Sequence, residues 1–88
     1  MTYEWDEEKN RANKAKHGIG FEAMVRFEWD TALLDIDERA YDELREVADG
    51  LIGPALFHVV FTRRNHVIRV ISLRKTTKKE RLNYAKNF

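Results

Sequence analysis

The residues of this chain best suited to chemistry are its cations, and many of them lie close together. The run from Val67 to Tyr84 passes from a strand-like VIRVISLRK into a helix-like TTKKERLNY. Residues 51–88 hold 9 Lys and Arg but one acid, Glu80, whereas residues 1–50 hold 7 against 14, so the two parts carry net charges of +8 and −7. A concentrated basic patch is the usual footprint of a polyanion-binding protein. Charge alone is equally consistent with a basic face that is merely exposed to solvent, or with a basic half that pairs with the acidic half of the same chain.

Length and composition restrict the remaining possibilities. The 88 residues are expected to form a single domain over residues 1–88, with an ordered core that uses 5 Phe, 3 Tyr and 2 Trp. The chain has no cysteine, and His17, His58 and His66 lack the spacing of metal ligands, so neither a metal nor a cofactor is expected. No apolar stretch approaches the roughly 20 residues that span a bilayer, and the N-terminus is unlike a signal peptide. We therefore expect a cytoplasmic protein without membrane contacts.

Hydrophobic spacing and capping residues predict the element order β-α-α-β-β-β-β-α. Asp6 is placed to cap a helix over residues 7–17 that Gly18 would end, and Thr77 with Glu80 forms a capping box before a C-terminal helix. A second helix is predicted over residues 21–29. Apolar or alternating segments predict five strands, at residues 3–5, 32–36, 41–49, 56–62 and 67–74.

These elements predict an α+β fold, with two N-terminal helices and a C-terminal helix packed on an antiparallel sheet of four to five strands. The last four strands should form an antiparallel meander, because their connections are too short for crossovers. Helices on one face would leave the other face open and edged by Arg and Lys side chains. Within residues 67–74, a strict period of two places Arg69 with Val67 and Ile71, and Arg74 with Ser72 on the other face.

Specific motifs stand at both ends of the chain. Residues 3–21 read YEWDEEKNRANKAKHGIGF, and residues 69–84 follow the pattern R.IS.RK.T..ER..Y. Together they resemble the BrnT toxins, whose pattern W-D-x-x-K-x-x-x-N-x-x-K-H-G-[IV]-x-F falls here on Trp5, Asp6, Lys9, Asn13, Lys16, His17, Gly18 and Phe21. The resemblance covers nearly the whole chain. It departs mildly at Leu73, where a small residue is usual, at Arg63, where an acid is common, and at Leu44, where a polar residue is frequent.

The resemblance implies a toxin of a type II toxin–antitoxin system with a RelE-like fold. Such a toxin would be a metal-independent ribonuclease that arrests translation. Its antitoxin, BrnA, would be a ribbon-helix-helix protein that blocks the toxin and represses the shared operon. The expected partners are therefore an RNA substrate and a BrnA-like antitoxin, in a hetero-oligomer that binds operator DNA.

Metal-free RNA cleavage requires that the charge on a five-coordinate phosphorus be stabilised while protons move on and off oxygen. Arginine suits the first task, because its planar fork holds two phosphate oxygens and is always charged. The candidates on or beside the strands are Arg45, Arg64, Arg69 and Arg74. Arg74 and Arg45 are the best placed to face the open side. Arg69 serves equally well as a structural partner of an acid.

Few groups are available for proton transfer: His17, His58, His66, Tyr84 and Glu43. His17 is read first as a helix cap, His58 as a hydrogen-bonded core residue and His66 as a solvated turn residue. Tyr84 matches the tyrosine of the family's C-terminal motif, although it also fits a packing role. Glu43 is a candidate base, or a partner of Arg45 or Arg69. The predicted catalytic set is Arg45, Arg64, Arg74, Tyr84 and Glu43.

The remaining cations are predicted to contact the RNA backbone, which positions a nucleic acid without reading its sequence. This RNA-binding set comprises Lys9, Lys16, His17, Arg69, Lys75, Lys78 and Lys79. Solubility charge explains some of them equally well, above all Lys78 and Lys79. Two alternatives to a ribonuclease remain open: a nucleic-acid-binding module without catalysis, and a toxin-like scaffold that only assembles a repressor complex.

Overall fold

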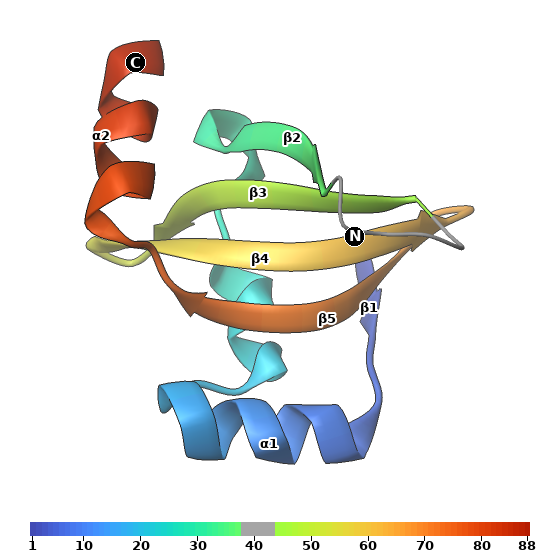
Figure 1. The fold of residues 1–88 in the computed structure, drawn as a ribbon. Helices are drawn as coiled ribbons and strands as arrows, with labels where there is room; N and C mark the ends of the chain where they lie inside the picture. Colours follow the sequence, from blue (N-terminus) through green and yellow to red (C-terminus); the bar gives the residue numbers. More distant parts are fainter. Residues whose placement is uncertain (38–43) are drawn as a thin grey trace.

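The computed structural model describes residues 1–37 and 44–88, which form one sheet flanked by helices (Figure 1). Five strands, β1 (Thr2–Glu4), β2 (Leu33–Asp37), β3 (Arg45–Ile52), β4 (Ala55–Arg64) and β5 (Val67–Lys75), pair in the order β1-β5-β4-β3-β2. The helices are α1 (Glu7–His17), the 3₁₀ segments η1 (Phe21–Arg26) and η2 (Trp29–Thr31), and α2 (Lys78–Asn87). The predicted α+β class and order of elements are confirmed.

The sheet is mixed, not purely antiparallel as the sequence suggested. Strands β2 to β5 form the expected antiparallel meander. Strand β1 instead joins β5 in parallel, with Tyr3 opposite Ile68. The parallel pairing is possible because α1 and the rest of the chain lie between the two strands and provide the long crossover that parallel neighbours require.

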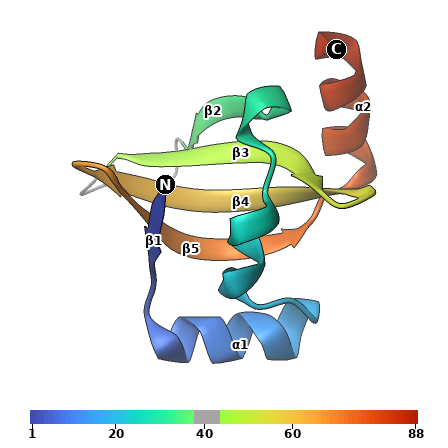
Figure 2. The same cartoon turned by 180° about the vertical axis from the view of Figure 1, so that it is seen from behind.

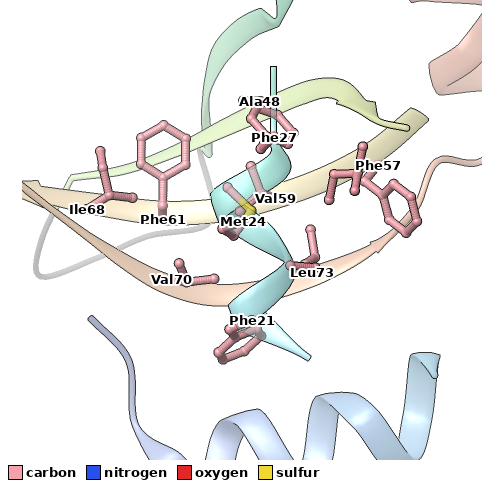
Figure 3. Packing of buried hydrophobic residues seen from close by; sticks show 12 residues of the cluster. Phe21, Met24, Phe27, Ala48, Phe57, Val59, Phe61, Ile68, Val70 and Leu73 are labelled. Atoms are coloured by element: carbon pink, nitrogen blue, oxygen red, sulfur yellow. The ribbon is translucent and has the colours of Figure 1, made fainter. Parts of the chain in front are cut away.

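One face of the sheet carries the hydrophobic core. The segment η1 crosses this face (Figure 2), and Phe21 and Met24, both 0% exposed, project from it onto the strands (Figure 3). Val59, Phe61 and Leu73 meet them from β4 and β5, also fully buried. Burial of such side chains contributes about 1.5–3 kcal/mol each, which makes this single layer the main source of stability.

Residues 21–29 do not form the continuous α-helix that their apolar spacing predicted. The helical turns of η1 close with the bond from Phe27 N to Met24 O, after which the backbone becomes extended. Phe27 then bridges to Ile52, and Glu28 N donates to Leu51 O. The chain leaves the helix because pairing with the end of β3 satisfies these backbone groups while Phe27 fills the space above Gly50.

Helix α1 lies along the part of the β5 edge that β1 leaves uncovered (Figure 1). Its ends are as predicted, because Asp6 accepts from Glu8 N and Lys9 N and Gly18 adopts a left-handed φ of 73°. Asn13 binds the β5 backbone in both directions: its Nδ2 donates to Leu73 O at 2.7 Å, and its Oδ1 accepts from Leu73 N. The Asn13 amide thus pairs with the β5 backbone as a neighbouring strand would, and it covers this part of the β5 edge.

The opposite surface of the sheet, here termed the outer face, holds Asp49, His58, Thr62, Arg69 and Arg74. Among the described elements, no helix crosses this surface (Figure 1). A bulge in β5 determines which β5 side chains lie on the outer face. Val60 pairs with Ser72 and Phe61 pairs with Val70, so Ile71 is left unpaired. The strict period of two was therefore wrong at this point. The extra residue brings Arg69 and Arg74 onto the same face.

Helix α2 stands at one end of the sheet and contributes no buried residue (Figure 1). The predicted capping box is present, since Thr77 Oγ1 accepts from Glu80 N and a Glu80 carboxylate oxygen accepts from Thr77 N. Its position differs from the expected packing on the sheet, because contact with η2 and the Arg74–Glu80 pair hold it at the sheet end. In the described parts of the chain, no helix is long and apolar enough to cross a membrane.

Candidate functional site

Three polar side chains stand side by side on the outer face, one from each of three neighbouring strands. Asp49 on β3 is opposite His58 on β4, which is opposite Arg74 on β5. Glu80 reaches the same group from α2. His58 Nδ1 lies 2.6 Å from Asp49 Oδ1 and 3.4 Å from Glu80 Oε2, and the side chains of His58 and Asp49 are each 12% exposed. We call these four residues the His58 cluster.

Arg74 and Glu80 form the ion pair of the His58 cluster. The guanidinium donates from Nη1 and Nη2 to the two carboxylate oxygens, at 2.8 and 2.9 Å, in a planar two-bond contact. This pairing, with the bond from Thr77 N and the nearby His58, holds the pKa of Glu80 down at about 2. The pKa of Arg74 rises for the reciprocal reason. Glu80 is therefore an anion at neutral pH and cannot serve as a proton donor.

The contacts of His58 determine which of its nitrogens is available. Because Asp49 is a carboxylate acceptor 2.6 Å from Nδ1, the proton of a neutral ring resides on Nδ1 and Nε2 carries the lone pair. Among the described residues, Nε2 has no hydrogen-bond partner, and it does not belong to the buried unpartnered atoms. A histidine oriented by an aspartate, with its second nitrogen accessible, is suited to general acid–base chemistry.

This arrangement was not predicted from the sequence. His58 was read as a core residue because the segment LFHVVFT is nearly continuously apolar. The signal that would have found it is parity, since Phe57 and Val59 face the core and residue 58 must face away. Asp49 was placed at the end of the predicted strand over residues 41–49 and was not a candidate site residue, whereas it lies within β3 on the same face as Val47.

Asp49, His58 and Glu80 also bring one possible metal ligand each within 4.8 Å of one another. The donor set is chemically suited to a divalent cation. In this arrangement, however, the Glu80 carboxylate is already neutralised by Arg74, and His58 Nδ1 is hydrogen-bonded to Asp49. A cation here would lie beside a guanidinium of the same sign, so the contacts favour a proton rather than a metal ion between these groups.

The predicted arginines share the outer face but do not form one cluster. Arg45 precedes Glu46, which pairs with Phe61, so the antiparallel register places Arg45 beside Thr62. Thr62 is four residues along β4 from His58, which is roughly 13 Å at about 3.3 Å per residue. Arg64 is further along the same strand and makes its own interactions. Arg74 therefore belongs to the His58 cluster, while Arg45 and Arg64 lie toward the opposite end.

The other predicted site residues lie at the margins. Tyr84 donates its hydroxyl to Thr31 O at 2.7 Å and stacks on Phe88, which attaches α2 to η2. Arg69 donates to Glu4 at 2.6 Å across the β1–β5 pair. Glu43 lies outside the described residues.

The predicted RNA-binding residues other than Arg69 fall into two groups. Lys9, Lys16 and His17 line one groove between α1 and β5, which Ser72 borders from the outer-face side. The groove brings part of the predicted RNA-binding set together. The other group is exposed at the end of β5 and in the first turn of α2 and comprises Lys75, Lys78 and Lys79.

The fold and the His58 cluster define a small α+β protein with an acid–base pair and an arginine on an open sheet face. The family model described as "Ribonuclease toxin, BrnT, of type II toxin-antitoxin system" matches residues 5–80, so the chain belongs to the BrnT family. The resemblance drawn from the two end motifs is thereby confirmed.

A solved structure supports the same assignment. The chain is similar to the ribonuclease toxin BrnT of Brucella abortus, known from a 1.1 Å crystal structure, with 28% sequence identity and a TM-score of 0.66. The match covers 89% of this chain and 100% of that one. No curated protein matches the chain significantly.

Proposed function

We propose that this protein is the toxin of a type II toxin–antitoxin system and cleaves RNA on its outer face without a metal ion. Family membership supports the ribonuclease activity. The observation that carries the mechanism is the 2.6 Å contact between His58 and Asp49, beside the guanidinium of Arg74. A polyanionic substrate also fits the net charge of +8 over residues 51–88, where 9 Lys and Arg accompany one acid.

His58 acts as the general base in this scheme. Its Nε2 takes the proton of an RNA 2′-hydroxyl, and the oxygen attacks the adjacent phosphorus. The bond between phosphorus and the 5′-oxygen breaks, and that oxygen takes a proton from solvent. The products are a 2′,3′-cyclic phosphate and a free 5′-hydroxyl. Asp49 stabilises the imidazolium that forms, as an oriented carboxylate does in other histidine-based sites.

Arg74 stabilises the charge that develops on the phosphate oxygens. Its bond to Glu80 fixes the plane of the guanidinium at the sheet surface, and 31% of its side chain stays exposed to a ligand. Glu80 is therefore a positioning residue, which couples the first turn of α2 to the site. Three of the remaining predicted catalytic residues keep peripheral roles in this proposal: Arg45 and Arg64 hold RNA farther along the face, and Tyr84 anchors α2.

The lysine groups extend the proposed RNA path beyond the sheet. Lys9, Lys16 and His17 contact the backbone from the groove beside α1, which adjoins Ser72 at the outer face. Lys75, Lys78 and Lys79 do so from the end of β5 and the start of α2. Contacts of this kind position the substrate and make binding strongly dependent on salt.

We further propose a RelE-like fold for this domain, arrest of translation as the outcome of cleavage, and neutralisation by a BrnA-like ribbon-helix-helix antitoxin in a complex that binds operator DNA. The family supports an antitoxin partner. The surface is suited to one, because β2 is an edge strand whose Leu34 and Ile36 are 41% and 55% exposed. Unpaired edges and exposed apolar side chains favour pairing with another chain.

The test uses the purified protein freed of any partner, added to a translation extract and to defined transcripts. Wild type is expected to cleave RNA and stop translation, and Arg74→Ala is expected to do neither. Arg26→Ala is the matched control, because Arg26 is exposed on η1, on the opposite side of the sheet. Circular dichroism verifies that both variants fold. Intact RNA and normal translation with folded wild type would favour the non-catalytic binding module instead.

A further inference from the structure

A row of alternating charge crosses the outer face away from the His58 cluster. Asp37 on β2 is opposite Arg45, Thr62 on β4 is opposite Arg69, and Arg69 is opposite Glu4 on β1. Arg45 and Thr62 are neighbours by the register that pairs Glu46 with Phe61. The row thus places one threonine hydroxyl between two arginines, with a carboxylate at each outer end. We call Arg45, Thr62 and Arg69 the Thr62 row.

Within the described part of the chain, two buried polar atoms of the Thr62 row have no hydrogen-bond partner. Thr62 is 2% exposed, and its Oγ1 has no hydrogen-bond partner. Arg45 Nε is buried and also lacks one. Each such group costs about 1–3 kcal/mol when it is removed from water without a partner. Proteins pair nearly all buried polar groups, so an unpaired N–H donor and an unpaired hydroxyl, which both donates and accepts, point to a missing polar ligand atom between these adjacent strands.

The chemistry of the Thr62 row identifies that acceptor. A guanidinium fork beside a hydroxyl donor is a typical arrangement for binding a phosphate, because it offers several donors and positive charge at one place. Arg69 donates a hydrogen bond from Nη1 to Glu4, and this bond holds the Arg69 side chain toward β1. Both carboxylates of the row lie at its ends, beyond the arginines, so neither of them lies between Arg45 and Arg69.

We propose that the Thr62 row is a second phosphate-binding subsite, which holds a backbone phosphodiester of the same RNA strand that the His58 cluster cleaves. The two lie on one open surface, roughly 13 Å apart along β4. A phosphate held there fixes the register of the RNA, and so determines which phosphodiester reaches His58. This inference rests on the proposed RNA substrate, but not on cleavage itself.

The test measures binding of a fully 2′-O-methylated RNA oligonucleotide, which lacks the hydroxyl that cleavage requires. Arg45→Gln is expected to weaken binding about tenfold and to lower the salt slope by about one. Thr62→Val keeps the shape of the side chain and is expected to weaken binding roughly two- to tenfold. Arg26→Gln, on the opposite side of the sheet, is the matched control and leaves both quantities unchanged.

Stability separates a ligand-binding hydroxyl from a structural one. Without RNA, Thr62→Val is expected to raise the Tm, because it removes a buried hydroxyl that has no partner. A lower Tm in the absence of RNA, or binding as tight as that of wild type, would overturn the subsite. The subsite would also be overturned if an acidic peptide competed with the RNA while neither Arg45→Gln nor Thr62→Val changed RNA binding.

Failure of the cleavage proposal gives a different result. If His58→Gln cleaves like wild type while Arg45→Gln and Thr62→Val still weaken binding of the oligonucleotide, the subsite holds and only the catalytic assignment fails. If both variants of the Thr62 row bind like wild type while His58→Gln is inactive, the catalytic assignment holds and the subsite fails.

Discussion

Replacement of Glu80 by glutamine removes the charge that holds Arg74 and preserves the helix start, because glutamine at this position also completes a capping box. The pKa of Glu80 lies at about 2 in the folded protein, against an ordinary value of 4.5. At about 1.36 kcal/mol per pH unit this difference sets an upper limit of about 3 kcal/mol. The side chain keeps 23% of its surface exposed, so water screens the pair, and we expect Glu80→Gln to cost about 1–2 kcal/mol.

The sign of the pH dependence follows from the lowered pKa. A carboxylate whose pKa is depressed by folding stabilises the protein fully above its unfolded value of 4.5, and this stabilisation is lost as the pH falls toward 2. The deficit of Glu80→Gln relative to wild type should therefore be largest near pH 7 and shrink to roughly half or less at pH 3.

Thermal unfolding followed by circular dichroism is the assay. For a domain of this size, about 1–2 kcal/mol corresponds to a decrease in Tm of roughly 5–15 °C at pH 7. The matched control is Glu28→Gln, an exposed acid on the surface, which should change the Tm little at either pH. A Glu80→Gln protein as stable as wild type at pH 7, or a deficit of equal size at pH 3 and pH 7, would refute the reasoning.

Three further substitutions test how the fold is held together. Asn13→Ala removes both bonds to the Leu73 backbone and should cost about 2–4 kcal/mol in urea unfolding, whereas a cost below about 0.5 kcal/mol would show that the β5 edge needs no protection. Gly50→Ala places a Cβ 2.5 Å from the Phe27 ring and should cost about 1–3 kcal/mol in the same assay, so an unchanged midpoint would contradict the packing. Thr77→Ala removes the cap of α2 and should cost about 1 kcal/mol; no change in Tm would show that the capping bond contributes nothing.

The sequence predicted those features that local chemistry determines. Asp6 and Gly18 mark the ends of α1 and Thr77 marks the start of α2, because each satisfies backbone groups within a few residues. The meander of β2 to β5 was also predictable from the short connections. The parallel partner of β5 was not, since no local signal at Tyr3 shows which strand it will meet.

The candidate site was less predictable, because it depends on register between strands. One unpaired residue, Ile71, reverses the face on which Arg69 stands relative to Arg74. A bulge of this kind leaves no clear mark in an apolar segment. His58 was assigned to the core for a related reason: the burial of Val60 on the outer face makes β4 read as apolar on both sides.

The distance between the predicted arginines was not predictable from the sequence either. No sequence pattern separates Arg45 from Arg74, since both are strand residues of the same type. Their β4 neighbours, Thr62 and His58, are four residues or roughly 13 Å apart, and this offset follows from the register of the assembled sheet. Only the three-dimensional arrangement shows that one arginine accompanies a histidine and the other a buried threonine.

The initial rate of RNA cleavage by His58→Gln, measured with a chelator present and with the product ends identified, tests the central claim most directly. His66→Gln is the matched control, because His66 is exposed in the turn between β4 and β5. We predict a loss of about 10²–10⁴-fold for His58→Gln, no loss for His66→Gln, and wild-type products that end in a 2′,3′-cyclic phosphate. Cleavage by His58→Gln at the wild-type rate, or wild-type activity that the chelator abolishes, would contradict the account.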